Sequence, residues 1–308
     1  MAGVPYTDPP QKRSPFRRPL VVVPAVLVPV VAAGWFAYSG TSGGGTTTAT
    51  AAPMSSEPAI PLPDMKSPAK PLTGRTIVID PGHNPTNYRH PSEINRLVDI
   101  GTNKKECDTT GTSTNATSTN ATSTNATSTN SAYTEAQFTL DVAHRMRTLL
   151  ESEGAKVKLT QDADRPFGPC VDERARIGNA AKADAVVSVH ADGSGTGNRG
   201  FHVILPGAVH EGTADTRPIV APSKRLGELV ANGFRRTTGS GPSNYVGSGT
   251  GLVTRTDLGG LNLSTVPKVF IECGNMRDPK DAALLTSGAW RQKAAQGISE
   301  GIVSFLRG

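Results

Sequence analysis

Three apolar, strand-like segments of the chain end in residues that can bind a metal ion or move a proton. Their final residues are His83, His190 and Glu272. In an open sheet of parallel strands the carboxyl ends meet at one edge, where ligands commonly bind. Neutral imidazole offers a directed nitrogen lone pair to zinc, and a carboxylate can accept a proton from water. The three segments therefore predict one crevice equipped for metal-assisted hydrolysis.

Each of these residues also has an alternative, structural explanation. A single histidine after a strand could be a hydrogen-bonded residue at the start of a loop, and Glu272 could be a salt-bridged residue at a strand end. Two histidines at equivalent strand ends weaken the first explanation. Glu272 follows the apolar run 269–271, and a carboxylate after such a run is costly unless it has a partner or a function. We therefore favour the catalytic interpretation.

A catalytic zinc site needs a third protein ligand and one open position for water. Glu135 is the preferred ligand because it begins the first long predicted helix, from which it can point back over the sheet edge. Glu93 and Glu106 compete with it from the preceding loop. Spacing alone would favour another role for Glu135, as a first-turn carboxylate that complements the helix dipole.

The elements that must position these residues follow from the hydrophobic periodicity, which alternates between strand and helix. Strands are predicted over 75–80, 157–160, 185–189, 201–205 and 268–271. Helices are predicted over 135–153, 171–183, 223–234 and 280–306, the last with a break at 286–288. This alternation predicts an α/β fold with a mostly parallel, twisted sheet and helices on both faces.

The N-terminal part of the 308-residue chain reads as targeting and linker sequence. A basic segment, 1–19, precedes an uncharged apolar run, 20–38, which is long enough to span a bilayer. By the positive-inside rule, everything after it lies outside the cytoplasm. The run is either a membrane anchor or a cleaved signal peptide, and its length and lack of a small-x-small cleavage site favour the anchor. Residues 39–72 are predicted to be a flexible linker, which leaves 73–308 as one exported domain.

A low-complexity insert interrupts this domain over 112–130, where the unit TSTNA repeats. It has no hydrophobic side chain larger than alanine, so we expect a surface loop or a disordered excursion. The net charge of +6 is modest for the length, and no face interleaves aromatic with basic residues. Nucleic acid is therefore a poor partner, whereas an anionic cell wall is compatible with the positive excess.

Five motifs resemble, in order, those of the zinc-dependent N-acetylmuramoyl-L-alanine amidases, most closely the mycobacterial-type members. They are TIVIDPGHN, the glutamate of YTEAQFTLDVAHRM, the Val-Lys-Leu-Thr strand, ERARIGNAAKADAVVSVHAD and VPKVFIECGNMRDPKDAALL. The resemblance runs from about residue 73 to the C-terminus. It implies one zinc ion bound by His83, Glu135 and His190, with Glu272 as the catalytic carboxylate. The implied reaction cuts the amide bond between N-acetylmuramic acid and L-alanine in peptidoglycan or its muropeptide fragments.

The sequence departs from this family pattern in two places. Asn84 stands where many members have glycine, and the TSTNA repeat lengthens the gap between His83 and Glu135.

The resemblance also suggests a disulfide between Cys107 and Cys170, which an exported domain would allow to form. Cys273 has no histidine motif of a thiol protease around it, so we interpret it as a small buried residue. Arg255 and Asn262, in the loop before the last predicted strand, are expected substrate contacts.

Other classes of function remain open at this stage. The chain could be a catalytically silent peptidoglycan-binding or regulatory homologue, although a binding protein has no use for a general base at Glu272. It could be a surface protein in which the domain is only a scaffold. Among enzymes, a zinc carboxypeptidase that acts on the stem peptide is the nearest competitor. In each case we expect a monomer.

Overall fold

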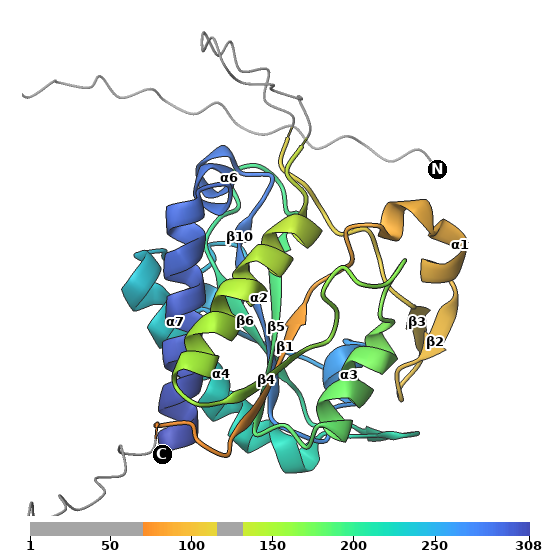
Figure 1. The fold of residues 1–308 in the computed structure, drawn as a ribbon. Coiled ribbons are helices and arrows are strands. Elements are labelled where there is room, and N and C mark those ends of the chain that lie inside the picture. Colours follow the sequence, from red (N-terminus) through yellow and green to blue (C-terminus); the bar gives the residue numbers. More distant parts are fainter. Residues whose placement is uncertain (1–69, 116–131) are drawn as a thin grey trace, which may run out of the picture. The chain divides into compact units, whose positions relative to one another are not determined.

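The computed structural model describes residues 70–115 and 132–308, which form a central six-stranded sheet covered by helices (Figure 1). In spatial order the strands are β4 (Lys156–Leu159), β1 (Thr76–Pro81), β5 (Ala185–Asp192), β10 (Lys268–Asn275), β6 (His202–Pro206) and β9 (Leu252–Arg255). The first four are parallel to one another, whereas β6 pairs antiparallel with β10 and β9 pairs parallel with β6. The predicted mostly parallel sheet is confirmed.

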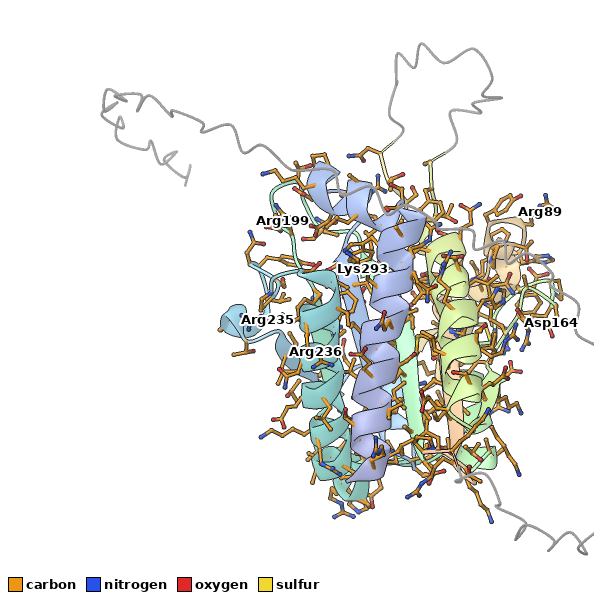
Figure 2. All side chains as sticks on the ribbon, turned by 60° about the vertical axis from the view of Figure 1, so that its left-hand side comes forward. Arg89, Asp164, Arg199, Arg235, Arg236 and Lys293 are labelled. Carbon is orange, nitrogen blue, oxygen red and sulfur yellow. A yellow bond between two sulfur atoms is a disulfide. The ribbon has the colours of Figure 1, made fainter. Side chains whose placement is uncertain are left out.

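Helices cover both faces of the sheet, as predicted. On one face α2 (Glu135–Ser152), α7 (Gly288–Arg307) and α4 (Arg217–Thr238) lie side by side (Figure 2). Alternate residues of the central strands point into this layer and form the main core with the helices. The opposite face carries α3 (Val171–Ala180), which packs on Val78 and Val186, together with the short α5 (Gly259–Asn262).

The long predicted elements are all present, with shifted ends. The predicted helix 223–234 is part of the longer α4, which continues through Pro222 although proline ordinarily interrupts a helix. The predicted break near 286–288 separates α6 (Pro279–Leu285) from α7, where Ser287 caps the new helix by accepting a hydrogen bond from the backbone N–H of Trp290.

Several short elements have no counterpart in the prediction. They are α1 (Pro91–Ile94), the hairpin of β2 (Leu97–Asp99) with β3 (Lys104–Glu106), the pair β7 (His210–Glu211) and β8 (Ala214–Asp215), the 3₁₀ turns Asn87–Arg89 and Gly247–Gly249, and the edge strand β9. Each has four residues or fewer, which is too short for a hydrophobic period to develop.

The predicted segments 1–19 and 20–38, most of the linker and residues 116–131 lie outside the described residues. Among the described residues, no helix combines the length and hydropathy needed to cross a membrane. The fold begins slightly before the predicted boundary at 73, because Leu72 is fully buried and its backbone N–H donates to the carbonyl of Glu153. At the base of the insert, Ser113 and Thr134 pair in an antiparallel bridge.

A disulfide joins Cys107 to Cys170, in agreement with the expected pairing. Cys107 directly follows β3, and Cys170 is the residue before α3. The bond therefore fastens the loop before the insert to the start of α3. Cys273 is buried and unbonded, as predicted.

Candidate metal centre

The carboxyl ends of β1 and β5 bring His83 and His190 together, and the first residue of α2 places Glu135 between them. Glu135 Oε2 lies 3.1 Å from His83 Nε2, and Glu135 Oε1 lies 3.0 Å from His190 Nδ1. One ligand atom from each residue lies within 4.8 Å of the others. Neither competing candidate belongs to this group, since Glu93 contacts His90 and Glu106 is exposed at the end of β3.

The start of α2 explains why the long insert does not displace Glu135. Thr134 and Gln137 form a capping box that fixes the first turn of the helix. The carboxylate of Glu135 then accepts hydrogen bonds from the backbone N–H groups of Thr112, at 2.9 Å, and Ala191, at 3.1 Å. These contacts, together with the bridge between Ser113 and Thr134, hold the Glu135 carboxylate in this position.

Close packing holds the two imidazole rings. The His83 and His190 rings meet edge to face with centroids 5.1 Å apart, and His190 stacks on Phe270 at 5.2 Å. Gly82 lies so close to His190 that a Cβ atom there would be 2.4 Å from the ring carbon Cε1. Only glycine leaves room for the ring at this turn.

The charges of the three residues suit a cation. Although burial opposes the shift, His83 and His190 hold the pKa of Glu135 well below its usual range, so the carboxylate is ionised at neutral pH. Burial likewise opposes protonation of His83, but Glu135 and Asp108 raise its pKa well above the usual value. An imidazole must lose this proton to bind a metal, so metal binding here releases protons. Two imidazole nitrogens and one carboxylate oxygen fit the donor set of catalytic zinc sites.

Glu272 lies on β10 between two histidines of neighbouring strands. It is in register with His190 on β5 and with His202 on β6, so the three side chains share one face of the sheet. Among the described residues, no hydrogen-bond partner reaches its buried Oε2 atom. Burial, followed by the charges of Glu135 and Asp192, raises the pKa of Glu272 well above the usual value. A carboxyl group with this property, beside a group that could hold a metal ion, can exchange protons with a substrate.

The two expected substrate contacts, Arg255 and Asn262, differ in exposure. Arg255, at the end of β9, is exposed and binds Asp257 at 2.7 Å, and its charge acts on Glu272. Asn262 is only 1% exposed and donates to the carbonyl of Thr256 at 2.8 Å. In this conformation Asn262 stabilises a loop and has no surface for a substrate.

Sequence reasoning did not single out Asp192 and Tyr245. The Tyr245 hydroxyl donates to Asp192 at 2.7 Å, and the Tyr245 ring meets His202 edge to face at 6.0 Å. Asp192 could have been noticed from its place two residues after His190, whereas Tyr245 lies in a glycine-rich loop without a readable pattern.

A cavity of about 270 Å³ lies beside His83 and His190 on the α3 face of the sheet. His83 and His190 form part of its wall, and Phe270, Leu258 and Gly259 supply apolar surface. A small ligand in this cavity could therefore reach both imidazole rings.

Known proteins are similar to this chain in sequence and in fold. Residues 77–304 match the family described as N-acetylmuramoyl-L-alanine amidase. The N-acetylmuramoyl-L-alanine amidase Rv3717 of Mycobacterium tuberculosis is 35% identical over 240 residues, which cover 76% of this chain and 88% of that protein. The crystal structure of the amidase Ami1 from Mycobacterium smegmatis is 36% identical, with a TM-score of 0.65 over 76% of this chain and 98% of that one. Ami1 from Mycobacterium abscessus has the same identity and TM-score over 100% of its length. The chain therefore belongs to the N-acetylmuramoyl-L-alanine amidase family.

Proposed function

We propose that this chain hydrolyses the amide bond between N-acetylmuramic acid and L-alanine in peptidoglycan, using one zinc ion and Glu272. The observation that carries the proposal is the group His83, Glu135 and His190, with Glu272 in register beside His190. Family membership supports the reaction, and the donor set supports the metal. A catalytically silent homologue would have no use for a free carboxylate in this position.

The zinc ion and Glu272 would have separate roles in the reaction. When bound, zinc would polarise the carbonyl of the scissile amide and lower the pKa of a water ligand to about 7. Glu272 accepts a proton from the attacking water and then donates it to the nitrogen of L-alanine, because an amine leaves only once it is protonated. Its raised pKa suits both steps, since the carboxyl group must bind the proton and then release it.

The proposed reaction also implies a location for the enzyme. Peptidoglycan lies outside the cytoplasm, which agrees with export directed by the apolar segment 20–38. We propose that this segment attaches the enzyme to the membrane and that the linker predicted over 39–72 lets the domain reach the wall. The substrate is then peptidoglycan or the muropeptides released from it, and the enzyme acts as a monomer.

A zinc titration of the full chain tests the metal requirement. We expect the metal-free protein to be inactive on muropeptides and turnover to rise in proportion to added zinc, with a plateau at one equivalent per chain. Magnesium, which prefers six oxygen ligands, should not restore turnover. Full turnover without metal, or a plateau at two equivalents, would contradict the proposed single-zinc site.

A further inference from the structure

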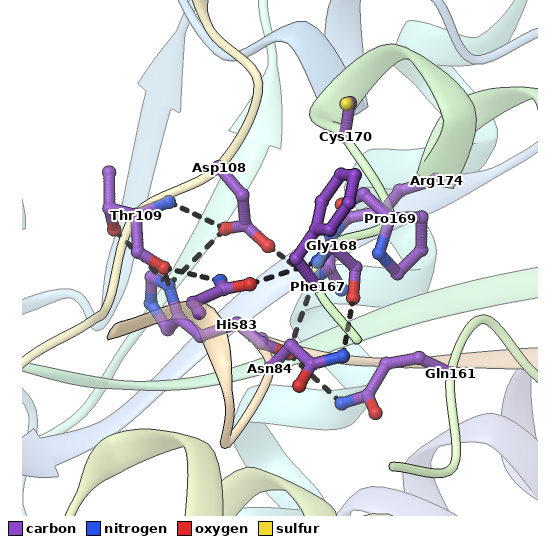
Figure 3. A network of polar contacts seen from close by, with 12 residues as sticks. His83, Asn84, Asp108, Thr109, Gln161, Phe167, Gly168, Pro169, Cys170 and Arg174 are labelled. Carbon is purple, nitrogen blue, oxygen red and sulfur yellow. Dashed lines mark hydrogen bonds and ion pairs between the residues drawn. The ribbon is translucent and has the colours of Figure 1, made fainter. Parts of the chain in front are cut away.

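A buried network of four charged side chains lies beneath the metal-binding group. Arg174 of α3 bonds Asp80 at 2.8 Å and Asp108 at 2.9 Å, and Lys268 of β10 bonds Asp80 at 3.1 Å. None of the four is more than 5% exposed. The two carboxylates balance the two cations, which is what keeps such charges tolerable in a protein interior. Figure 3 shows the part of this network that surrounds His83.

Asp108 connects this network to the metal ligand His83. Asp108 Oδ1 lies 3.4 Å from His83 Nδ1, and the backbone carbonyl oxygen of Thr109 lies 3.1 Å from the same nitrogen (Figure 3). A carbonyl oxygen and a carboxylate can only accept a hydrogen bond, and the Thr109 hydroxyl, 3.2 Å from Nδ1, can also accept one, so these contacts favour a proton on Nδ1. The other nitrogen, Nε2, faces Glu135, and once it has lost its proton it offers a lone pair to a metal.

Arg174 holds the backbone around His83 as well as the carboxylate of Asp108. Its guanidinium donates to the carbonyl of Pro81 at 2.6 Å and to the carbonyl of His83 at 3.2 Å. His83 has a φ of 62°, in the left-handed region that a residue with a side chain seldom adopts. These hydrogen bonds help to offset the cost of that conformation.

The disulfide ties the loop that carries Asp108 to the helix that carries Arg174. Cys107 precedes Asp108, and Cys170 lies one helical turn before Arg174. The two segments are also joined by a 2.7 Å hydrogen bond from the backbone N–H of Val171 to the carbonyl of Cys107. Asp108 is therefore fixed relative to Arg174 by covalent, backbone and ionic contacts.

We propose that Asp108 is a positioning residue for the metal ligand His83, and that Arg174 and the Cys107–Cys170 disulfide hold Asp108 in place. The inference rests on the proposed metal centre. Asp108, together with the carbonyl oxygen of Thr109, fixes the tautomer and the ring orientation of His83, so that Nε2 faces Glu135. Outer contacts of this kind typically change metal affinity or activity by about 10- to 100-fold.

The test compares the full chain with Asp108→Asn, Asp108→Glu and the control Glu173→Gln. Glu173 lies on the same helix as Arg174 but pairs with Arg165 at the partly exposed surface. Three quantities are measured: zinc affinity by competition with a chelator, the visible spectrum of the cobalt(II)-substituted protein, and the melting temperature of the metal-free protein. Asp108→Glu keeps a charge for Arg174, so it reports on the site if Asp108→Asn fails to fold.

We expect Asp108→Asn to raise the zinc Kd about 10- to 100-fold and to shift the cobalt spectrum, with Asp108→Glu between it and the unaltered protein. Glu173→Gln should leave both unchanged. An unchanged Kd and spectrum in folded Asp108 variants would overturn the inference and leave the zinc site itself intact. Failure of the unaltered chain to bind one zinc would instead overturn the proposed function, and this inference with it.

Removal of the disulfide tests the second half of the inference. The double substitution Cys107→Ser with Cys170→Ser should weaken zinc binding in the unaltered chain but add little in the Asp108→Asn background, because both changes act through His83. Fully additive losses in the two backgrounds would show that the disulfide does not act through Asp108.

Discussion

Replacement of Glu272 by glutamine is expected to lower the turnover of muropeptides by about 10²- to 10⁴-fold, the usual contribution of a general acid–base residue. Glutamine has nearly the same shape but cannot accept the proton of the attacking water. The three proposed metal ligands are untouched, so the zinc affinity should stay close to that of the unaltered protein. The matched control is Glu211→Gln, which changes an exposed glutamate on β7. Wild-type turnover in a folded, zinc-loaded Glu272→Gln protein would rule out the assigned role.

The pH dependence of kcat/KM in the unaltered enzyme and in Glu272→Gln tests the role of Glu272 independently. Glu272 acts as a base only when it is deprotonated, and burial with the nearby Glu135 and Asp192 raises its pKa. In the unaltered enzyme kcat/KM should therefore fall as the pH is lowered through this pKa. The residual activity of Glu272→Gln should lack that acidic limb. The same limb in both proteins would assign it to another group.

Replacement of His190 by alanine has the second large expected effect, the loss of bound zinc. It leaves only His83 and Glu135 as donors and also removes the ring that packs between His83 and Phe270. The loss of affinity should exceed the roughly 100-fold upper range for outer-shell contacts, and turnover should fall with zinc content.

The matched control is His144→Ala, because His144 is a more exposed histidine of α2 that contacts Asp162 and lies outside the proposed site. Zinc per chain after dialysis, measured alongside turnover, decides the result. One tightly held zinc and full turnover in His190→Ala would show that the metal binds elsewhere.

The sequence predicted most of the central sheet because its strands are buried on both sides and read as continuous apolar runs. The edge strand β9 was not predicted, because its four residues are partly exposed or exposed and show neither a polar–apolar alternation nor a long apolar run. The hairpin of β2 and β3 is rich in charged residues, and only its pairing across Leu97–Asp99 and Lys104–Glu106 defines it. Such elements depend on contacts that local pattern does not contain.

The residues of the candidate site also differ in how well the sequence alone predicts them. His83, His190 and Glu272 were predictable because each ends an apolar, strand-like run of sequence, and parallel strands bring their carboxyl ends to one edge of the sheet. Glu135 needed the family resemblance, since its position depends on backbone contacts with Thr112 and Ala191 that span the insert.

The supporting network was not predictable from local pattern. Arg174 joins Asp80 and Asp108 across 94 and 66 residues of sequence. Asn262 was expected to touch substrate, but the turn of α5 buries it. In each case tertiary packing decides which polar side chains face the cavity.

The most direct test of the central claim is mass spectrometry of the products that the full chain releases from muramyl dipeptide. We predict free N-acetylmuramic acid and intact dipeptide, formed only when zinc and Glu272 are both present. The absence of these products, both from muramyl dipeptide and from polymeric peptidoglycan at full zinc occupancy, would contradict the assignment and favour a silent wall-binding homologue. Cleavage within the stem peptide instead would identify a carboxypeptidase.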